Sequence, residues 1–178
     1  MQTVRVWDPV VRLFHWSLVI LFTLNAAFLE EDGTPHEWVG YGVLALVAVR
    51  VLWGIVGTRH ARFSAFPPDP LAAAGHLRDL VAGRHRRHMS HNPLGALMVY
   101  NLILTMIVIG VTGYMMTTIT FFGYEWVEEL HEMFVTWAIL SAFLHIGGVI
   151  FESLRGRENL VKAMITGRKR ARPGGSAE

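Results

Sequence analysis

The 178-residue sequence contains no cysteine. This absence excludes disulfides, thiolate-bound metals, iron–sulfur clusters and covalently attached c-type haem, which needs a C-x-x-C-H motif. Charged residues are also scarce, at 17% against the roughly 25% of a typical soluble domain, whereas 52% of the residues are hydrophobic. This composition favours a membrane protein over a soluble domain.

Four long apolar segments account for most of the hydrophobic residues, at about 10–29, 35–56, 93–119 and 126–151. Each is long enough to cross about 30 Å of hydrocarbon as a helix that rises about 1.5 Å per residue. The sequence therefore predicts an all-α membrane protein, a four-helix transmembrane bundle. We expect one domain over residues 1–155, followed by a basic cytoplasmic tail over 156–178.

The polar segments around these spans predict smaller elements. Asp69-Pro70 would start an amphipathic helix on the membrane surface, and a short helix is expected from Glu158 to Ile165. The tail from Gly167 onwards is expected to be disordered. The first apolar run lacks a small-residue cleavage pattern, so we expect a retained first helix and no signal peptide.

Two of the connections between the predicted spans have no lysine or arginine. The 16 basic residues all lie near the N-terminus, at the end of the second span and in the connection after it, or near the C-terminus, which a four-span topology places on one side. Because basic residues flank spans on the cytoplasmic side, both termini are predicted to be cytoplasmic, and the pI of about 9.3 reflects topology better than nucleic-acid binding. The opposite side carries eight carboxylates: Glu30, Glu31, Asp32, Glu37, Glu125, Glu128, Glu129 and Glu132.

The nine histidines divide by their expected depth. Four lie in the basic connection after the second span and are expected to face solvent or lipid headgroups: His60, His76, His85 and His88. Four others, His15, His36, His131 and His145, lie within or at the rim of the spans, where an ionisable group is a candidate for function. The alternating direction of the spans places His15 level with His145 on the inner side, and His36 level with His131 on the outer side.

His131 and His145 lie fourteen residues apart on one predicted helix. At about 100° and 1.5 Å per residue, the two rings would face the same interior, about 40° and 21 Å apart. This arrangement suits two flat cofactors, and two haems with an imidazole on each face need four histidines at two heights. Zinc fits less well, because it needs four ligands around one ion. As another alternative to haem binding, each histidine would only form hydrogen bonds between helices.

Other residues in the spans are candidates for secondary contacts. Arg50 would pair with a haem propionate, or extend outward to the headgroups. His91 would contact the same propionates or a quinone, or lie at the interface. Small residues, Gly40, Ser141 and Gly148, lie near the candidate ligands and would leave room for a porphyrin, although small residues also promote helix packing.

Five motifs in chain order carry a family resemblance: RLFHW, HEWVGYG, HNPLG, LHE and FLHIGG. With them the sequence resembles the bacterial cytochrome b561 family and the b-type cytochrome subunits of nickel–iron hydrogenases. The resemblance implies a multi-pass protein of the bacterial inner membrane that binds two non-covalent b-type haems and exchanges electrons with the quinone pool. It assigns the axial ligands to His15, His36, His131 and His145, with His15 and His145 holding the inner haem iron.

Three functions follow from these expectations. An iron with histidine on both faces has no open coordination site and suits electron transfer, so the leading hypothesis connects a periplasmic partner, such as a c-type cytochrome, with the membrane quinone pool. The first alternative is a superoxide:ubiquinone oxidoreductase, but acidic outer loops repel an anion and attract a basic partner. The second is a cytochrome b subunit or haem-free anchor of a hydrogenase or other respiratory complex.

Overall fold

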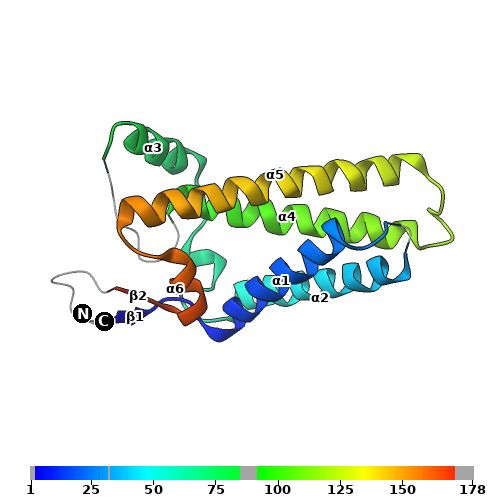
Figure 1. The fold of residues 1–178 in the computed structure, drawn as a ribbon, viewed down its shortest axis with the longest axis horizontal. Coiled ribbons are helices and arrows are strands. Elements are labelled where there is room, and N and C mark those ends of the chain that lie inside the picture. Colours follow the sequence, from blue (N-terminus) through cyan, green and yellow to red (C-terminus); the bar gives the residue numbers. More distant parts are fainter. Residues whose placement is uncertain (1–2, 32, 85–91, 171–178) are drawn as a thin grey trace.

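The computed structural model describes residues 3–31, 33–84 and 92–170. Four long helices dominate it: α1 (Pro9–Ala27), α2 (Thr34–Val56), α4 (Pro93–Met116) and α5 (Glu125–Gly156) (Figure 1). All four are long and apolar enough to cross a membrane. The predicted four-helix membrane bundle is therefore confirmed.

The helix boundaries follow local capping chemistry. The side chain of Asp8 accepts a hydrogen bond from the Val11 amide at 2.9 Å, and that of Asn92 accepts one from the Gly95 amide at 2.6 Å, each just before a proline that starts a helix. The last of the four long helices, α5, continues five residues past its predicted end, to Gly156. The polar residues that follow its apolar run are also helical. The helix ends where Arg157 takes the left-handed conformation, with φ of 48°.

The helices pack in the order α1, α2, α4, α5, each close to the next. Their shared core contains Val43 and Val47 of α2, Met106 of α4 and Ala138 of α5. Gly110 lets α4 approach α2 closely, because a side chain there would come within 2.7 Å of Leu44. The main partner of α5 is α4, and α5 lies farther from the backbones of α1 and α2 (Figure 1).

Smaller elements gather at the end of the bundle where the first and last strands pair, which we call the terminal end of the bundle (Figure 1). They are β1 (Thr3–Arg5), the 3₁₀ turn η1 (Phe63–Ala65), α3 (Pro70–Val81), α6 (Leu160–Thr166) and β2 (Arg168–Arg170). The opposite end, with residues 28–31, 33 and 117–124, is the loop end. Both predicted short helices are present, although the second starts two residues later than expected.

The start of the tail is ordered, contrary to the expectation of disorder from Gly167. Residues 168–170 form β2, which pairs antiparallel with β1 so that Thr3 lies opposite Arg170. Each strand has three residues, and the pairing is stabilised by the neighbouring hydrogen bonds from the Val6 and Trp7 amides to the Gly167 carbonyl. Residues 171–178 lie outside the described part of the chain.

One histidine of the basic connection is buried, and its predicted solvent-facing position is wrong. The side chain of His76 on α3 is only 4% exposed, and its Nε2 lies 3.5 Å from Oε1 of Glu152 on α5. A second link to α5 is the hydrogen bond from Arg155 to the Leu80 carbonyl, at 3.2 Å. These links hold α3 against the bundle and cover His76. His60 is half-buried, whereas His85 and His88 lie outside the described residues.

Candidate functional site

Four histidine rings meet in two pairs between the helices. His15 of α1 faces His145 of α5 with ring centroids 6.4 Å apart, and His36 of α2 faces His131 of α5 at 6.5 Å. An imidazole nitrogen binds a first-row metal at about 2.0–2.1 Å and lies about 1.1 Å from its ring centre, so two rings on opposite sides of one metal have centroids about 6.3 Å apart. Both pairs match this spacing.

A single helix sets the distance between the pairs. α5 runs without interruption from Glu125 to Gly156 and contributes one ring to each pair. The fourteen-residue interval between His131 and His145 places the pairs about 21 Å apart along the helix axis. Among the described residues, no three His, Asp or Glu side chains come together as a metal site. The arrangement offers two ligands at each of two levels, and this does not suit a tetrahedral zinc ion.

Thr112 of α4 orients the ring of His131. Its Oγ1 lies 2.8 Å from the Val108 carbonyl and 3.1 Å from the Ile109 carbonyl, and both of these groups can only accept a hydrogen bond. The single hydroxyl proton of Thr112 is therefore used there, and Oγ1 accepts from Nδ1 of His131, 3.0 Å away. This fixes the proton of His131 on Nδ1 and leaves the Nε2 lone pair available to a metal.

The partner rings have fewer contacts with the protein. Nδ1 of His15 and Nδ1 of His36 are buried and have no hydrogen-bond partner among the described residues. Nε2 of His36 lies 3.5 Å from Nδ2 of Asn25, the outer limit of a hydrogen bond. Buried polar nitrogens without partners are uncommon in proteins, so these rings are suited to a further ligand.

Glycines leave space around the pairs. A methyl group added at Gly147 or Gly148, just after His145, would meet no atom within 4 Å, and one added at Gly40 would meet only Asn25, at 3.8 Å. Gly113 is different, because its Cβ would come within 3.2 Å of the His131 ring. The donor set, the ring spacing and the open glycine positions all fit a flat cofactor such as haem.

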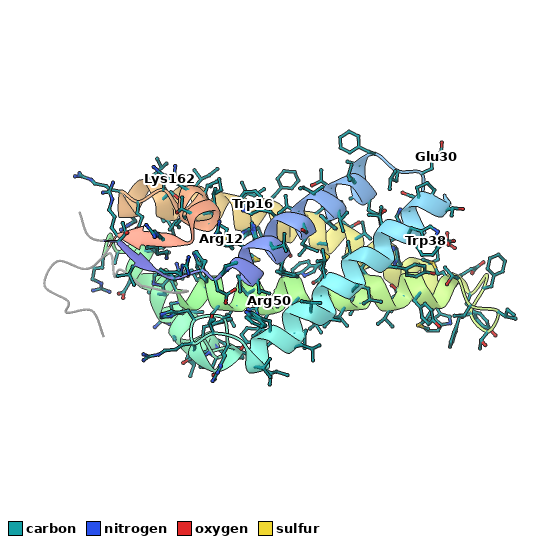
Figure 2. The ribbon with its side chains drawn as sticks, turned by 90° about the horizontal axis from the view of Figure 1, so that it is seen from below. Arg12, Trp16, Glu30, Trp38, Arg50 and Lys162 are labelled. Carbon is teal, nitrogen blue, oxygen red and sulfur yellow. The ribbon has the colours of Figure 1, made fainter. Side chains whose placement is uncertain are left out.

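Arg50 lies near the terminal end of α2 and faces into the protein (Figure 2). The residue is 4% exposed, and its Nη2 donates to the Ala61 carbonyl at 3.1 Å. The guanidinium also lies over the Phe63 ring, 4.9 Å from the ring centroid. Its Nη1 is buried without a partner among the described residues, which leaves a donor for an anionic group. His91, the other candidate for such a contact, lies outside the described residues.

Asp8 joins the first two helices beside Arg50. Its Oδ2 accepts hydrogen bonds from Trp53 Nε1 at 3.0 Å and from Thr58 Oγ1 at 2.5 Å. Burial by itself would raise the pKa of Asp8, but the hydrogen bonds from Thr58, Trp53 and the Val11 amide outweigh it, and the net pKa is lowered. The terminal end therefore retains an ionised carboxylate that organises α1 and α2.

Asn101 of α4 links this helix to α5. Asn101 donates to Ser141 of α5 at 2.9 Å and accepts from Trp137 Nε1 at 2.9 Å. Thr105 is 2% exposed. Polar residues within membrane helices commonly form such hydrogen bonds between helices.

The loop end is acidic at its surface. Of the eight carboxylates predicted there, Asp32 lies outside the described residues, and the side chains of the other seven are exposed. Exposed aromatic residues accompany them, including Trp38 and Trp126, which are 69% and 50% exposed.

Comparison with known proteins identifies the family. Residues 6–167 match the model of the prokaryotic cytochrome b561 family. One relative, described as a probable Ni/Fe-hydrogenase B-type cytochrome subunit of Rhodobacter capsulatus, is 22% identical over an alignment that covers 94% of this chain and 81% of the relative. No solved structure matches. The chain belongs to the prokaryotic cytochrome b561 family, as a multi-pass protein of the bacterial inner membrane that transfers electrons with b-type haem.

Proposed function

We propose that the protein holds two b-type haems and transfers electrons between a soluble redox partner at its loop end and the membrane quinone pool. The observation that carries this proposal is the presence of two histidine pairs, with ring centroids 6.4 and 6.5 Å apart, at two levels of one helix bundle. His15 and His145 would ligate the iron near the terminal end, and His36 and His131 the iron near the loop end. Haem supplies a reversible one-electron change when bound.

The residues of the chain would determine how that change is used. A histidine on each side of a metal leaves no position for a substrate, which favours electron transfer over oxygen chemistry. Thr112 would hold His131 in the ligating tautomer, and the buried, unpartnered Nη1 of Arg50 would offer a hydrogen bond to a propionate. The bundle, residues 1–155, would form the electron-transfer domain, and residues 156–178 the basic tail.

The distribution of charge supports an orientation and a kind of partner. The terminal end carries the basic residues and would lie in the cytoplasm, so that the loop end would face the periplasm. Seven exposed glutamates at the loop end favour a basic partner, such as a small c-type cytochrome, and disfavour an anion such as superoxide. The superoxide:ubiquinone oxidoreductase activity is therefore the less favoured reaction.

An anaerobic reduction assay tests this function. We expect a quinol to reduce the purified protein, with the appearance of b-type absorption bands, and a basic c-type cytochrome to reoxidise it at a rate that falls as salt is added. An acidic c-type cytochrome is the matched control and should react more slowly. Reduction by superoxide that is faster than reduction by quinol would contradict the proposed function.

The Rhodobacter capsulatus relative supports a second candidate, a cytochrome b subunit of a hydrogenase. In this function the loop end would dock a hydrogenase in place of a cytochrome. Hydrogen-dependent appearance of the b-type bands in native membranes, lost when this chain is deleted, would favour the hydrogenase. Unchanged hydrogen-dependent electron transfer after deletion would exclude it.

A further inference from the structure

A pocket outside the histidine pairs opens at the terminal end, between α1 and α6. It has a volume of about 500 Å³ and is lined by Pro9, Arg12, Leu13, Trp16 and Ile165. Figure 2 shows Arg12 and Trp16 one turn apart on α1 beside α6, which also carries Lys162. From this pocket we infer a binding site for the phosphate headgroup of an anionic phospholipid in the adjacent leaflet.

The position of the pocket suits a lipid. Leu13 is 70% exposed and Ile165 is 53% exposed, so the walls present apolar surface to the surroundings. The pocket lies at the first two turns of a membrane-spanning helix, where acyl chains meet headgroups. An amphiphile would place its chains along Leu13 and its headgroup toward Arg12. Basic pockets at this level are known to suit anionic headgroups.

Arg12 is fixed in place but has no counterion. Its Nη2 donates to the Ile165 carbonyl, and it lies against Gly167, where a Cβ would come within 3.3 Å of the Arg12 side chain. Within the part of the chain that the structure describes, no carboxylate forms an ion pair with Arg12. A guanidinium that is held rigidly at the membrane border without a counterion presents donors that match the oxygens of a phosphate.

Two buried donors of the pocket also lack acceptors. Nε of Arg12 and Nε1 of Trp16 are covered by the protein and have no hydrogen-bond partner among the described residues. Phosphate oxygens accept several hydrogen bonds at once, so a bound phosphate would supply the acceptors that these two side chains lack. Two acidic groups of the terminal end are engaged elsewhere, since Asp8 accepts from Thr58 and Trp53, and Glu158 accepts from the Arg170 amide.

Surrounding charge adds to the attraction. Lys162, Arg168 and Arg170 are exposed on α6 and β2. A general positive field would attract any anionic lipid surface without a specific site. A specific site and a general field differ in which arginine affects lipid binding, because Arg12 lines the pocket and Arg59 does not. Arg59 lies in the exposed turn after α2 and provides the matched control for loss of one positive charge.

The test measures bound phospholipid on the full-length, haem-loaded protein after exchange into detergent, with phosphatidylglycerol or phosphatidylcholine added, read by native mass spectrometry. We expect selective retention of phosphatidylglycerol, weakened about tenfold in Arg12→Gln and unchanged in Arg59→Gln. Trp16→Phe, which keeps the ring and removes one donor, should weaken it about threefold. Inorganic phosphate at matched concentration should not displace the lipid.

Several results would overturn the site. Equal retention of the two lipids by the wild type would exclude headgroup selectivity. Equal losses of bound phosphatidylglycerol in Arg12→Gln and Arg59→Gln would show that the general positive field alone attracts the lipid. Displacement of the lipid by inorganic phosphate would show that the pocket binds a free anion. If Arg12→Gln does not accumulate, the selectivity of the wild type and the Trp16→Phe variant decide the question. The ligands of the histidine pairs play no part in this result, so it is independent of the proposed function.

Discussion

The two histidine pairs have nearly the same ring spacing but different surroundings. At the loop end, His131 donates to Thr112, and exposed glutamates lie nearby. At the terminal end, Nδ1 of His15 has no partner among the described residues, and the charged residues of that end include Arg12 and Arg50. The ring spacing supports the proposal that each pair holds an iron, and the different surroundings would make the two irons unequal.

These differences predict an order of reduction potentials. A hydrogen bond donated from Nδ1 makes an imidazole a stronger ligand, and nearby negative charge stabilises the ferric form. Both effects act at the loop end, and cations act in the opposite direction at the terminal end. We expect the loop-end haem to have the lower potential.

The largest expected effect is the loss of one of the two proposed haems when an axial histidine is replaced. His131→Ala should abolish the loop-end haem and His15→Ala the terminal-end haem, because an iron that loses one of two axial ligands is held weakly. The haem-to-protein ratio of each purified variant, with its potentiometric titration, measures this. His60→Ala is the control, since His60 lies in the turn after α2 and away from both pairs. Retention of both haems in either variant would refute the assigned ligand pairing.

A smaller effect is expected from the residue that orients His131. Thr112→Val keeps the shape of the side chain and removes the hydrogen-bond acceptor, so the lower of the two potentials should rise by about 40 mV, the one-electron equivalent of about 1 kcal/mol. Thr105→Val, on the same helix and equally buried, should leave both potentials unchanged. A shift of the higher potential instead would reverse the assigned order.

Asp8→Asn should destabilise the terminal end by about 2 kcal/mol, because Trp53 and Thr58 lose a charged acceptor. The pKa of Asp8 in the folded protein is below its ordinary value of 3.8, so its contribution is complete above that pH and is lost as the pH falls through the lowered pKa. Thermal unfolding measured across this range should show an acid-induced loss in the wild type that Asp8→Asn lacks. The same pH dependence in both proteins would exclude this role.

The smallest effect is expected at the helix that covers the terminal end. His76→Ala removes the contact with Glu152 and should release α3 from α5 at a cost of about 1 kcal/mol. Limited proteolysis between α2 and α4 should become faster, while the titration of the loop-end haem stays the same. Unchanged proteolysis would show that α3 is held by its other contacts.

The sequence predicts the spans well, because hydrophobic length is a local property. It predicts the end of α5 poorly, since hydropathy marks the edge of the membrane and the helix continues to Gly156. The pairing of β1 with β2 has no local signal, because two three-residue segments at opposite ends of the chain meet only after the bundle has formed.

The histidine pairs could be predicted because helix periodicity and the alternating direction of spans determine depth and face. Their surroundings could not be predicted in the same way. Thr112 meets His131 only through the packing of α4 on α5, and a threonine in a membrane helix carries no signal of its own. The burial of His76 depends on α3 folding back on the bundle, which the polar composition of that connection did not indicate.

The haem content of the purified wild-type protein tests the central claim most directly. Reduced-minus-oxidised spectra combined with a haem-to-protein ratio should give two b-type haems per chain that titrate at two different potentials. A ratio of one, or no b-type absorption change at all, would contradict the assignment of the two histidine pairs as two haem sites.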